Sequence, residues 1–120
     1  MSDHDLIKAL IETYFLGQST GDAIHMRSAF LPTARIEGIR QEKFTSWTLE
    51  DYCAMFDGQP AANEAERRRS LDRIEIVAPT VATAVATLVH DATTFTDCFA
   101  LLKVDGAWRI ADKVYHAKAT

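Results

Sequence analysis

The stretch LLKVDGAWRIADKVYHA, residues 101–117, decides the fold because it consists of two strand-forming runs joined by a tight turn. Asp105 and Gly106 supply the positive φ angles that a two-residue hairpin requires, so the stretch predicts a β-hairpin. On its second arm, Trp108 and Ile110 lie two residues apart and therefore point to the same face of the strand. A hairpin of this kind indicates an antiparallel sheet.

The two-residue period extends backwards from this hairpin to about residue 68. Turn residues divide the second half of the chain into strands at about 68–78, 81–90, 93–104 and 107–118, which predicts an antiparallel meander. Both faces of the meander are largely apolar, whereas a sheet exposed on one side would carry polar residues on that side. We therefore expect helices to cover one face and a second copy of the chain to cover the other, which gives a homodimer.

The first half of the chain contains the helices. Apolar residues recur at three- and four-residue steps from position 6 to position 15, after Asp3 or Asp5, either of which can cap the helix. This helix is expected to end near residues 17–21. The remaining predicted elements are a helix at 22–30, strands at 34–39 and 43–47, a helix that starts at 48, and a loop at 57–66.

The composition limits the classes of function. A chain of 120 residues with 48% hydrophobic content predicts one domain, residues 1–120, and its net charge of -4 argues against a nucleic-acid partner. The two cysteines show no zinc-site spacing, and no apolar run reaches membrane-spanning length. Phosphate-binding glycine loops and paired histidines are missing as well. We expect a soluble cytoplasmic protein with no metal, no cofactor and no membrane partner.

Short motifs and the order of the elements resemble the nuclear-transport-factor-2-like superfamily, and most closely the family called putative lumazine-binding proteins. The motifs are Tyr14-Phe15, Gly21-Asp22, Ala29-Phe30, Leu101 to Gly106 and Trp108-Arg109-Ile110. The resemblance covers almost the whole chain. It implies an α+β, cystatin-like cone, in which a curved antiparallel sheet wraps around the N-terminal helix, two further short helices join it, and an internal pocket remains.

Ketosteroid isomerases share this fold, and their site uses an aspartate base, a tyrosine and a protonated aspartic acid. When the shared Gly-Asp and Phe positions are set in register, the tyrosine corresponds to Tyr14. The base then falls on Gly38 and the donor acid at about Ala100. Because neither position carries a carboxylate, isomerisation by that scheme is not expected.

The same register directs the even-numbered residues of the last strand into the pocket. Asp112 and His116 would then bracket a ligand, with Tyr14 as a hydrogen-bond donor, and these three form the candidate catalytic set. Asp97 is expected on the opposite face, and His90 in a turn. The predicted pocket lining comprises Phe15, Ile36, Trp47, Tyr52, Phe56, Ala100, Leu102, Trp108 and Val114.

Three functions remain open from the sequence. The first is a pocket protein that binds a small apolar or aromatic molecule, such as an aromatic heterocycle, as the family resemblance implies. The second is a lyase, isomerase or cyclase that transfers protons with His116, Asp112 and Tyr14. The third is an interaction module whose outer sheet face forms a dimer or recruits another protein.

Overall fold

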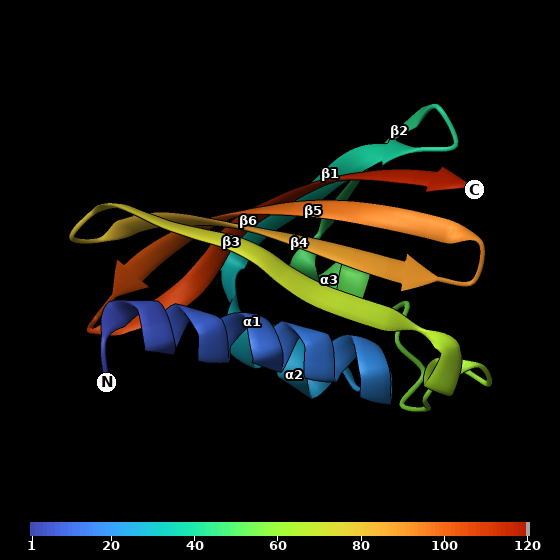
Figure 1. Cartoon of the computed structure of the whole chain (residues 1–120), viewed down its shortest axis with the longest axis horizontal. Coiled ribbons are helices and arrows are strands. Elements are labelled where there is room, and N and C mark those ends of the chain that lie inside the picture. Colours follow the sequence, from blue (N-terminus) through green and yellow to red (C-terminus); the bar gives the residue numbers. More distant parts are fainter. Residues whose placement is uncertain (120) are drawn as a thin grey trace.

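The computed structural model describes residues 1–119, and its helices gather on one side of a single sheet (Figure 1). Helix α1 spans Asp3–Thr20, α2 spans Ala23–Ala29, and α3 spans Leu49–Cys53, with a short 3-10 helix, η1, at Glu64–Glu66. Among these helices none is long and apolar enough to cross a membrane.

Local sequence signals explain where the helices begin and end. The hydroxyl of Ser2 caps α1 by accepting a hydrogen bond from the Asp5 N–H. The expectation that Asp3 or Asp5 is the cap was therefore wrong. Gly21 ends α1 with a φ of 70°, a left-handed conformation that glycine adopts without steric cost. Asp22 caps α2 and Thr48 caps α3, each through a side-chain oxygen.

The six strands form one sheet in the order β2-β1-β6-β5-β4-β3. The strands are β1 Phe30–Arg40, β2 Lys43–Thr48, β3 Arg68–Ala78, β4 Val81–His90, β5 Thr93–Val104 and β6 Ala107–Ala119. Strands β3 to β6 pair antiparallel in succession, which confirms the predicted meander, whereas β1 joins β6 in parallel. The α+β class and the curved sheet packed on the N-terminal helix are therefore as predicted.

The core lies between α1 and the inner face of the sheet. Ile7, Ile11 and Tyr14 of α1 are completely buried, and Figure 1 shows this helix running along that face. The inner positions of β4 are mostly alanines (82, 84 and 86), all buried, and their short side chains leave room for the bulky residues of the helix. Strand β5 contributes Phe99 and Leu101 to the same core, rather than Ala100 and Leu102.

A bulge in β6 decides which side chains of this strand face the cone. Ala100 pairs with Asp112, but the next residue of β5 pairs with Ile110, so Ala111 has no partner across the strand pair. Before the bulge the even-numbered residues are buried, and after it Lys113, Tyr115 and residue 117 are buried instead. The predicted inward orientation of Asp112, Val114 and His116 is therefore wrong.

Candidate functional site

A cavity of about 540 Å³ opens between the inner face of the sheet, the C-terminal half of α1, and the segment that follows α3. Aromatic side chains from five parts of the chain form much of its wall: Trp47, Tyr52, Phe56, Phe95 and Tyr115. Cavities of this size accommodate small organic molecules, and aromatic walls favour flat, partly apolar ones.

Three polar side chains meet at the buried end of the cavity, although they come from α1, β5 and β6. The Tyr14 hydroxyl donates to Asp97 Oδ2 over 2.5 Å, and Lys113 Nζ donates to the Tyr14 oxygen over 2.7 Å. Lys113 Nζ also lies 3.6 Å from Asp97 Oδ2, and both side chains are almost completely buried. A buried ion pair survives in a protein only where such additional hydrogen bonds satisfy it.

Tyr52 of α3 and Gln18 of α1 extend this cluster towards the cavity. The Tyr52 oxygen accepts a hydrogen bond from Gln18 Nε2 over 2.7 Å and a longer one from Lys113 Nζ over 3.4 Å. Two donors that point at a phenol oxygen strengthen its O–H as a donor. Because Tyr52 lines the cavity, its proton can be donated to a ligand.

Burial and charge set the protonation states of the cluster. Burial lowers the pKa of Lys113, but the charge of Asp97 and the Tyr52 oxygen outweigh this effect and raise it above its usual value, so the amine is an ammonium. Burial, followed by the charge of Asp97, raises the pKa of Tyr14 well above its usual value. Burial also raises the pKa of Tyr52. All three groups are therefore protonated at neutral pH.

Aromatic rings surround the Lys113 ammonium. Nζ lies 5.0 Å from the ring centres of Tyr14 and Tyr52 and 5.2 Å from that of Tyr115. Cation–π contacts at this distance stabilise a desolvated charge. By contrast, Asp97 Oδ1 is buried and has no hydrogen-bond partner among residues 1–119. One strong acceptor in the cluster is thus left for a ligand or a water molecule.

Trp47 and Tyr115 stack with each other in the cavity wall. Their rings are parallel within 8°, with centres 6.4 Å apart, and the Tyr115 hydroxyl lies 2.5 Å from Thr45 Oγ1. Gly38 makes this position possible, because a Cβ atom there would overlap the carbonyl oxygen and ring of Tyr115. Both residues add aromatic surface to the cavity, which favours an aromatic ligand.

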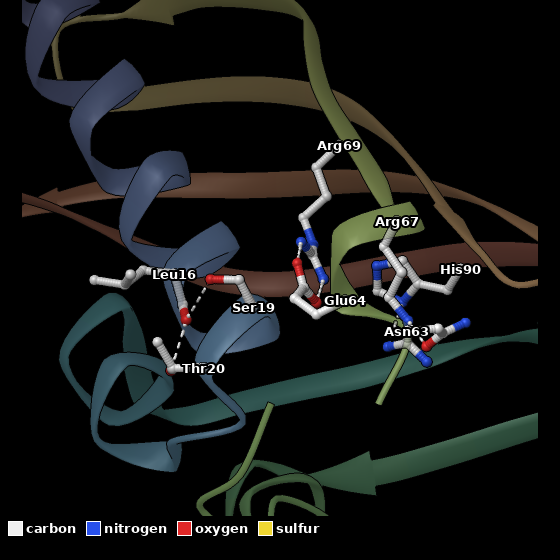
Figure 2. Close-up of polar contacts among 8 residues, drawn as sticks. All are labelled: Leu16, Ser19, Thr20, Asn63, Glu64, Arg67, Arg69 and His90. Atoms are coloured by element: carbon white, nitrogen blue, oxygen red, sulfur yellow. Dashed lines mark hydrogen bonds and ion pairs between the residues drawn. The ribbon is translucent and has the colours of Figure 1, made fainter. Parts of the chain in front are cut away.

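A second cluster of polar side chains lies at the mouth of the cavity, where β3 begins and β4 ends (Figure 2). Arg67 donates to Asn63 Oδ1 and pairs with Asp91, and its guanidinium lies 3.4 Å from His90 Nδ1. Burial, and then the charges of Arg69 and Arg67, lower the pKa of His90 to about 4, so this imidazole is neutral at physiological pH. These contacts attach the loop after α3 to the sheet.

The predicted catalytic residues do not come together. Tyr14 is in the buried cluster, but Asp112 and His116 lie exposed on the outer face of the sheet, where Asp112 Oδ1 accepts from the Arg35 N–H. No metal-binding group of three His, Cys, Asp or Glu side chains occurs within residues 1–119.

The predicted pocket lining divides into three groups. Trp47, Tyr52 and Phe56 line the cavity. Ile36 and Trp108 are buried in the core away from it, where the Trp108 indole donates to Asp3 Oδ1, and the half-buried Phe15 packs against that core. Ala100, Leu102 and Val114 are exposed on the outer face, so their assignment to the pocket was wrong.

Sequence reasoning missed Asp97 and Lys113, for different reasons. Residues that lie directly opposite each other in an antiparallel strand pair point to the same face of the sheet. Trp108 lies opposite Lys103, and Ile110 lies opposite Leu101. Once Trp108 and Ile110 were placed inward, the odd-numbered residues of β5, including Asp97, had to face inward too. Lys113 could not be found in this way, because its orientation depends on the bulge at residue 111.

Comparisons with known proteins agree with the geometry of the fold. An NTF2-like protein of unknown function from Methylobacillus flagellatus KT is 31% identical, with a TM-score of 0.82 over 98% of this chain and 93% of that chain. An NTF-2 like protein of unknown function from Silicibacter pomeroyi DSS-3 is 21% identical, with a TM-score of 0.85 over 98% and 100%. These likenesses confirm the superfamily that the sequence motifs indicated.

Among curated proteins, the aldolase FrzH from Cladobotryum sp is 22% identical over 120 residues, which cover 97% of this chain and 92% of FrzH. The model of the family described as "Putative lumazine-binding" matches residues 2–116. Because that match spans nearly the whole chain, the protein belongs to the putative lumazine-binding family of the nuclear-transport-factor-2-like superfamily.

Proposed function

We propose that this protein binds a planar organic molecule whose carbonyl oxygen is held by Tyr52 and Lys113 at the buried end of the cavity. One observation carries the proposal: a polarised phenol on the cavity wall lies next to a buried ammonium group. Hydrogen bonds from such donors to a carbonyl are strong in a buried site, because little water competes with them.

The walls of the cavity support a flat ligand. The side chains of Trp47 and Tyr115 give the wall aromatic surface, and Phe56 and Phe95 add further apolar area. The family description names lumazine, a bicyclic heterocycle with two ring carbonyls, which fits both features. Lumazine is therefore the first compound to test, and 2-acetylnaphthalene, a flat ketone without ring nitrogens, is the second.

A fluorescence titration of the purified protein with each compound tests the proposal. We expect saturable binding of at least one compound, and Tyr52→Phe should weaken it roughly tenfold, because one buried hydrogen bond of about 1–1.5 kcal/mol is lost. His116→Ala on the outer face is the matched control and should leave the affinity unchanged. If neither compound saturates the wild-type protein, or if Tyr52→Phe binds as tightly as the wild type, the proposal is wrong.

A second candidate function is proton transfer at the carbon next to the carbonyl group. The Lys113 ammonium and the Tyr52 hydroxyl would stabilise an enolate oxygen, and Asp97 Oδ1, which has no partner in the described residues, is available to accept a proton. The relative FrzH is described as an aldolase, and aldol reactions proceed through enolates or their equivalents. The earlier set with Asp112 and His116 is no longer a candidate, since those residues face outward.

Deuterium exchange separates binding from this chemistry. In D₂O, the protein should accelerate exchange of the methyl protons of 2-acetylnaphthalene, as followed by proton NMR. Lys113→Met should abolish the acceleration, while His116→Ala should retain it. If the protein binds the ketone but the methyl protons exchange no faster than in buffer alone, the second candidate function is wrong. The protein would then bind this ligand without transferring protons.

We also propose that the outer face of the sheet pairs with a second copy of the chain. The outer positions of β4, β5 and β6 include apolar side chains that remain 37–52% exposed: Val81, Leu102 and Val114. Apolar groups gathered on one face are typical of an interface. This arrangement would leave the cavity, on the opposite face, open to ligands.

A further inference from the structure

The cavity has a second polar end, and the two ends are separated by an aromatic ring. Thr93, Phe95 and Asp97 occupy successive inner positions of β5 and all line the cavity. Four residues of extended strand span about 13 Å, so the mouth at Thr93 is well separated from the buried cluster at Asp97. A ligand long enough to fill the cavity would contact both ends.

His90 provides a hydrogen-bond donor at this mouth. A guanidinium group can only donate, so the contact of Arg67 with Nδ1 makes that nitrogen the acceptor and places the proton of the neutral ring on Nε2. The His90 side chain lines the cavity and is only 9% exposed. Its Nε2 is buried and has no hydrogen-bond partner among residues 1–119. A buried donor without an acceptor costs stability, which a ligand acceptor would restore.

Arg40 provides a positive charge at the same place. Its guanidinium lies over the Phe95 ring, 5.4 Å from the ring centre, and the His90 ring lies 5.6 Å from that centre. Within the described part of the chain, the Arg40 guanidinium takes part in no ion pair or hydrogen bond. Arg40 and His90 therefore flank one aromatic ring at the cavity mouth.

Two carboxylates near the mouth already form ion pairs. Asp91 pairs with Arg67. Glu64 forms two hydrogen bonds with Arg69, over 2.6 and 2.8 Å, and Figure 2 shows this pair. Asp57, which also lines the cavity, accepts from the Gln59 N–H. Among the described residues, the cation at the mouth that has no ion-pair partner is thus Arg40, and its guanidinium can bind a negatively charged ligand group.

We propose that Arg40 and His90 bind a carboxylate of the ligand at the cavity mouth. This inference rests on the proposed function, because the other end of the same molecule carries the carbonyl held by Tyr52 and Lys113. The ligand class is then a flat, two-ring aromatic or heteroaromatic carbonyl compound with a carboxylate at the opposite end. Phe95 lies between the two binding groups and contacts the rings.

Three related compounds test the inference: 6-acetyl-2-naphthoate, its neutral methyl ester, and 2-acetylnaphthalene. The wild-type protein should bind the carboxylate at least tenfold more tightly than either neutral compound, and added salt should reduce this preference. Arg40→Gln should remove the preference for the carboxylate over its methyl ester. Arg40 is exposed, so this variant should fold normally. His90→Phe should reduce the preference, and His90→Gln, which keeps a donor, should restore part of it.

The outcomes separate the two proposals. If 2-acetylnaphthalene binds but the carboxylate gives no advantage, the carboxylate site is wrong while the carbonyl site stands. The carboxylate site is also wrong if the preference survives in both Arg40→Gln and His90→Phe. If none of the three compounds binds, the proposed function is wrong and this inference fails with it.

Discussion

Lys113 is an almost completely buried lysine whose charge is compensated from several sides. Asp97 supplies the opposite charge, the oxygens of Tyr14 and Tyr52 accept its protons, and three aromatic rings surround the ammonium. Removing one partner of a buried pair is costly, because the other charge is then left without compensation. The stability of the protein with this buried ammonium group therefore depends on Asp97.

Lys113→Met should therefore lower the free energy of unfolding by about 3–5 kcal/mol, since it leaves the Asp97 carboxylate buried and unpaired. Adding Asp97→Asn to this variant should recover part of the loss, because the amide carries no charge. Urea denaturation of the two variants and the wild type measures the effect. An unfolding free energy of Lys113→Met within about 1 kcal/mol of the wild type would contradict the described ion pair.

His90 should make stability depend on pH below neutrality. Its pKa is about 4 in the folded protein and 6.5 in the unfolded chain, so the unfolded chain binds the proton more readily. The stability that the neutral His90 contributes is fully present above pH 6.5 and is lost as the pH falls towards 4. This contribution to the free energy of unfolding is at most about 3 kcal/mol, and solvent that reaches His90 at the cavity mouth reduces it.

The measurement is urea denaturation at about pH 7.5 and about pH 5, with His90→Gln as the reference variant. The wild type should lose more stability than this variant over that interval, because glutamine does not titrate. Equal losses in both proteins would mean that His90 is not held neutral at the mouth.

Among the elements, β6 shows both how far the sequence predicts this protein and where it fails. The turn at Asp105 and Gly106 and the alternating residues around it correctly indicated the hairpin, and the apolar period indicated α1. The bulge at Ala111 gives no comparable signal, because alanine fits either face of a strand. Consequently the fold could be predicted almost completely, whereas the site was assigned to the wrong face of this strand.

Deleting Ala111 tests the role of the bulge directly. The deletion removes the unpaired residue but keeps the pairs of Ile110 with Leu101 and of Asp112 with Ala100, so Lys113 still faces inward. We expect the variant to fold with the same buried residues, because no side chain of β6 changes its face. Loss of the cooperative melting transition and of the near-ultraviolet circular dichroism would contradict this interpretation of β6.

At the scale of the whole molecule, the sheet separates the cavity from the proposed dimer face. Its inner face and the helices enclose the cavity, while its outer face exposes the apolar side chains of Leu102 and Val114. Such a division would let the protein assemble without blocking access to its ligand. The site is built from α1, α3, β5 and β6, so no single segment could bind a ligand alone.

Sedimentation velocity should show a dimer for the wild type, and Leu102→Glu should shift it to monomers, because a charge on the outer face cannot be buried without a partner. Ile24→Glu, which also replaces an exposed apolar residue but lies on α2, is a control that should remain dimeric. A wild-type protein that stays monomeric at high concentration would exclude self-association through this face.

The ¹³C chemical shift of the carbonyl carbon of bound, labelled 2-acetylnaphthalene tests most directly whether Tyr52 and Lys113 hold a ligand carbonyl. Two strong donors polarise the C=O bond, so the bound signal should lie downfield of its position in water. In Tyr52→Phe, it should move back upfield. A bound signal at or upfield of the aqueous position, and unchanged by Tyr52→Phe, would contradict the proposed site.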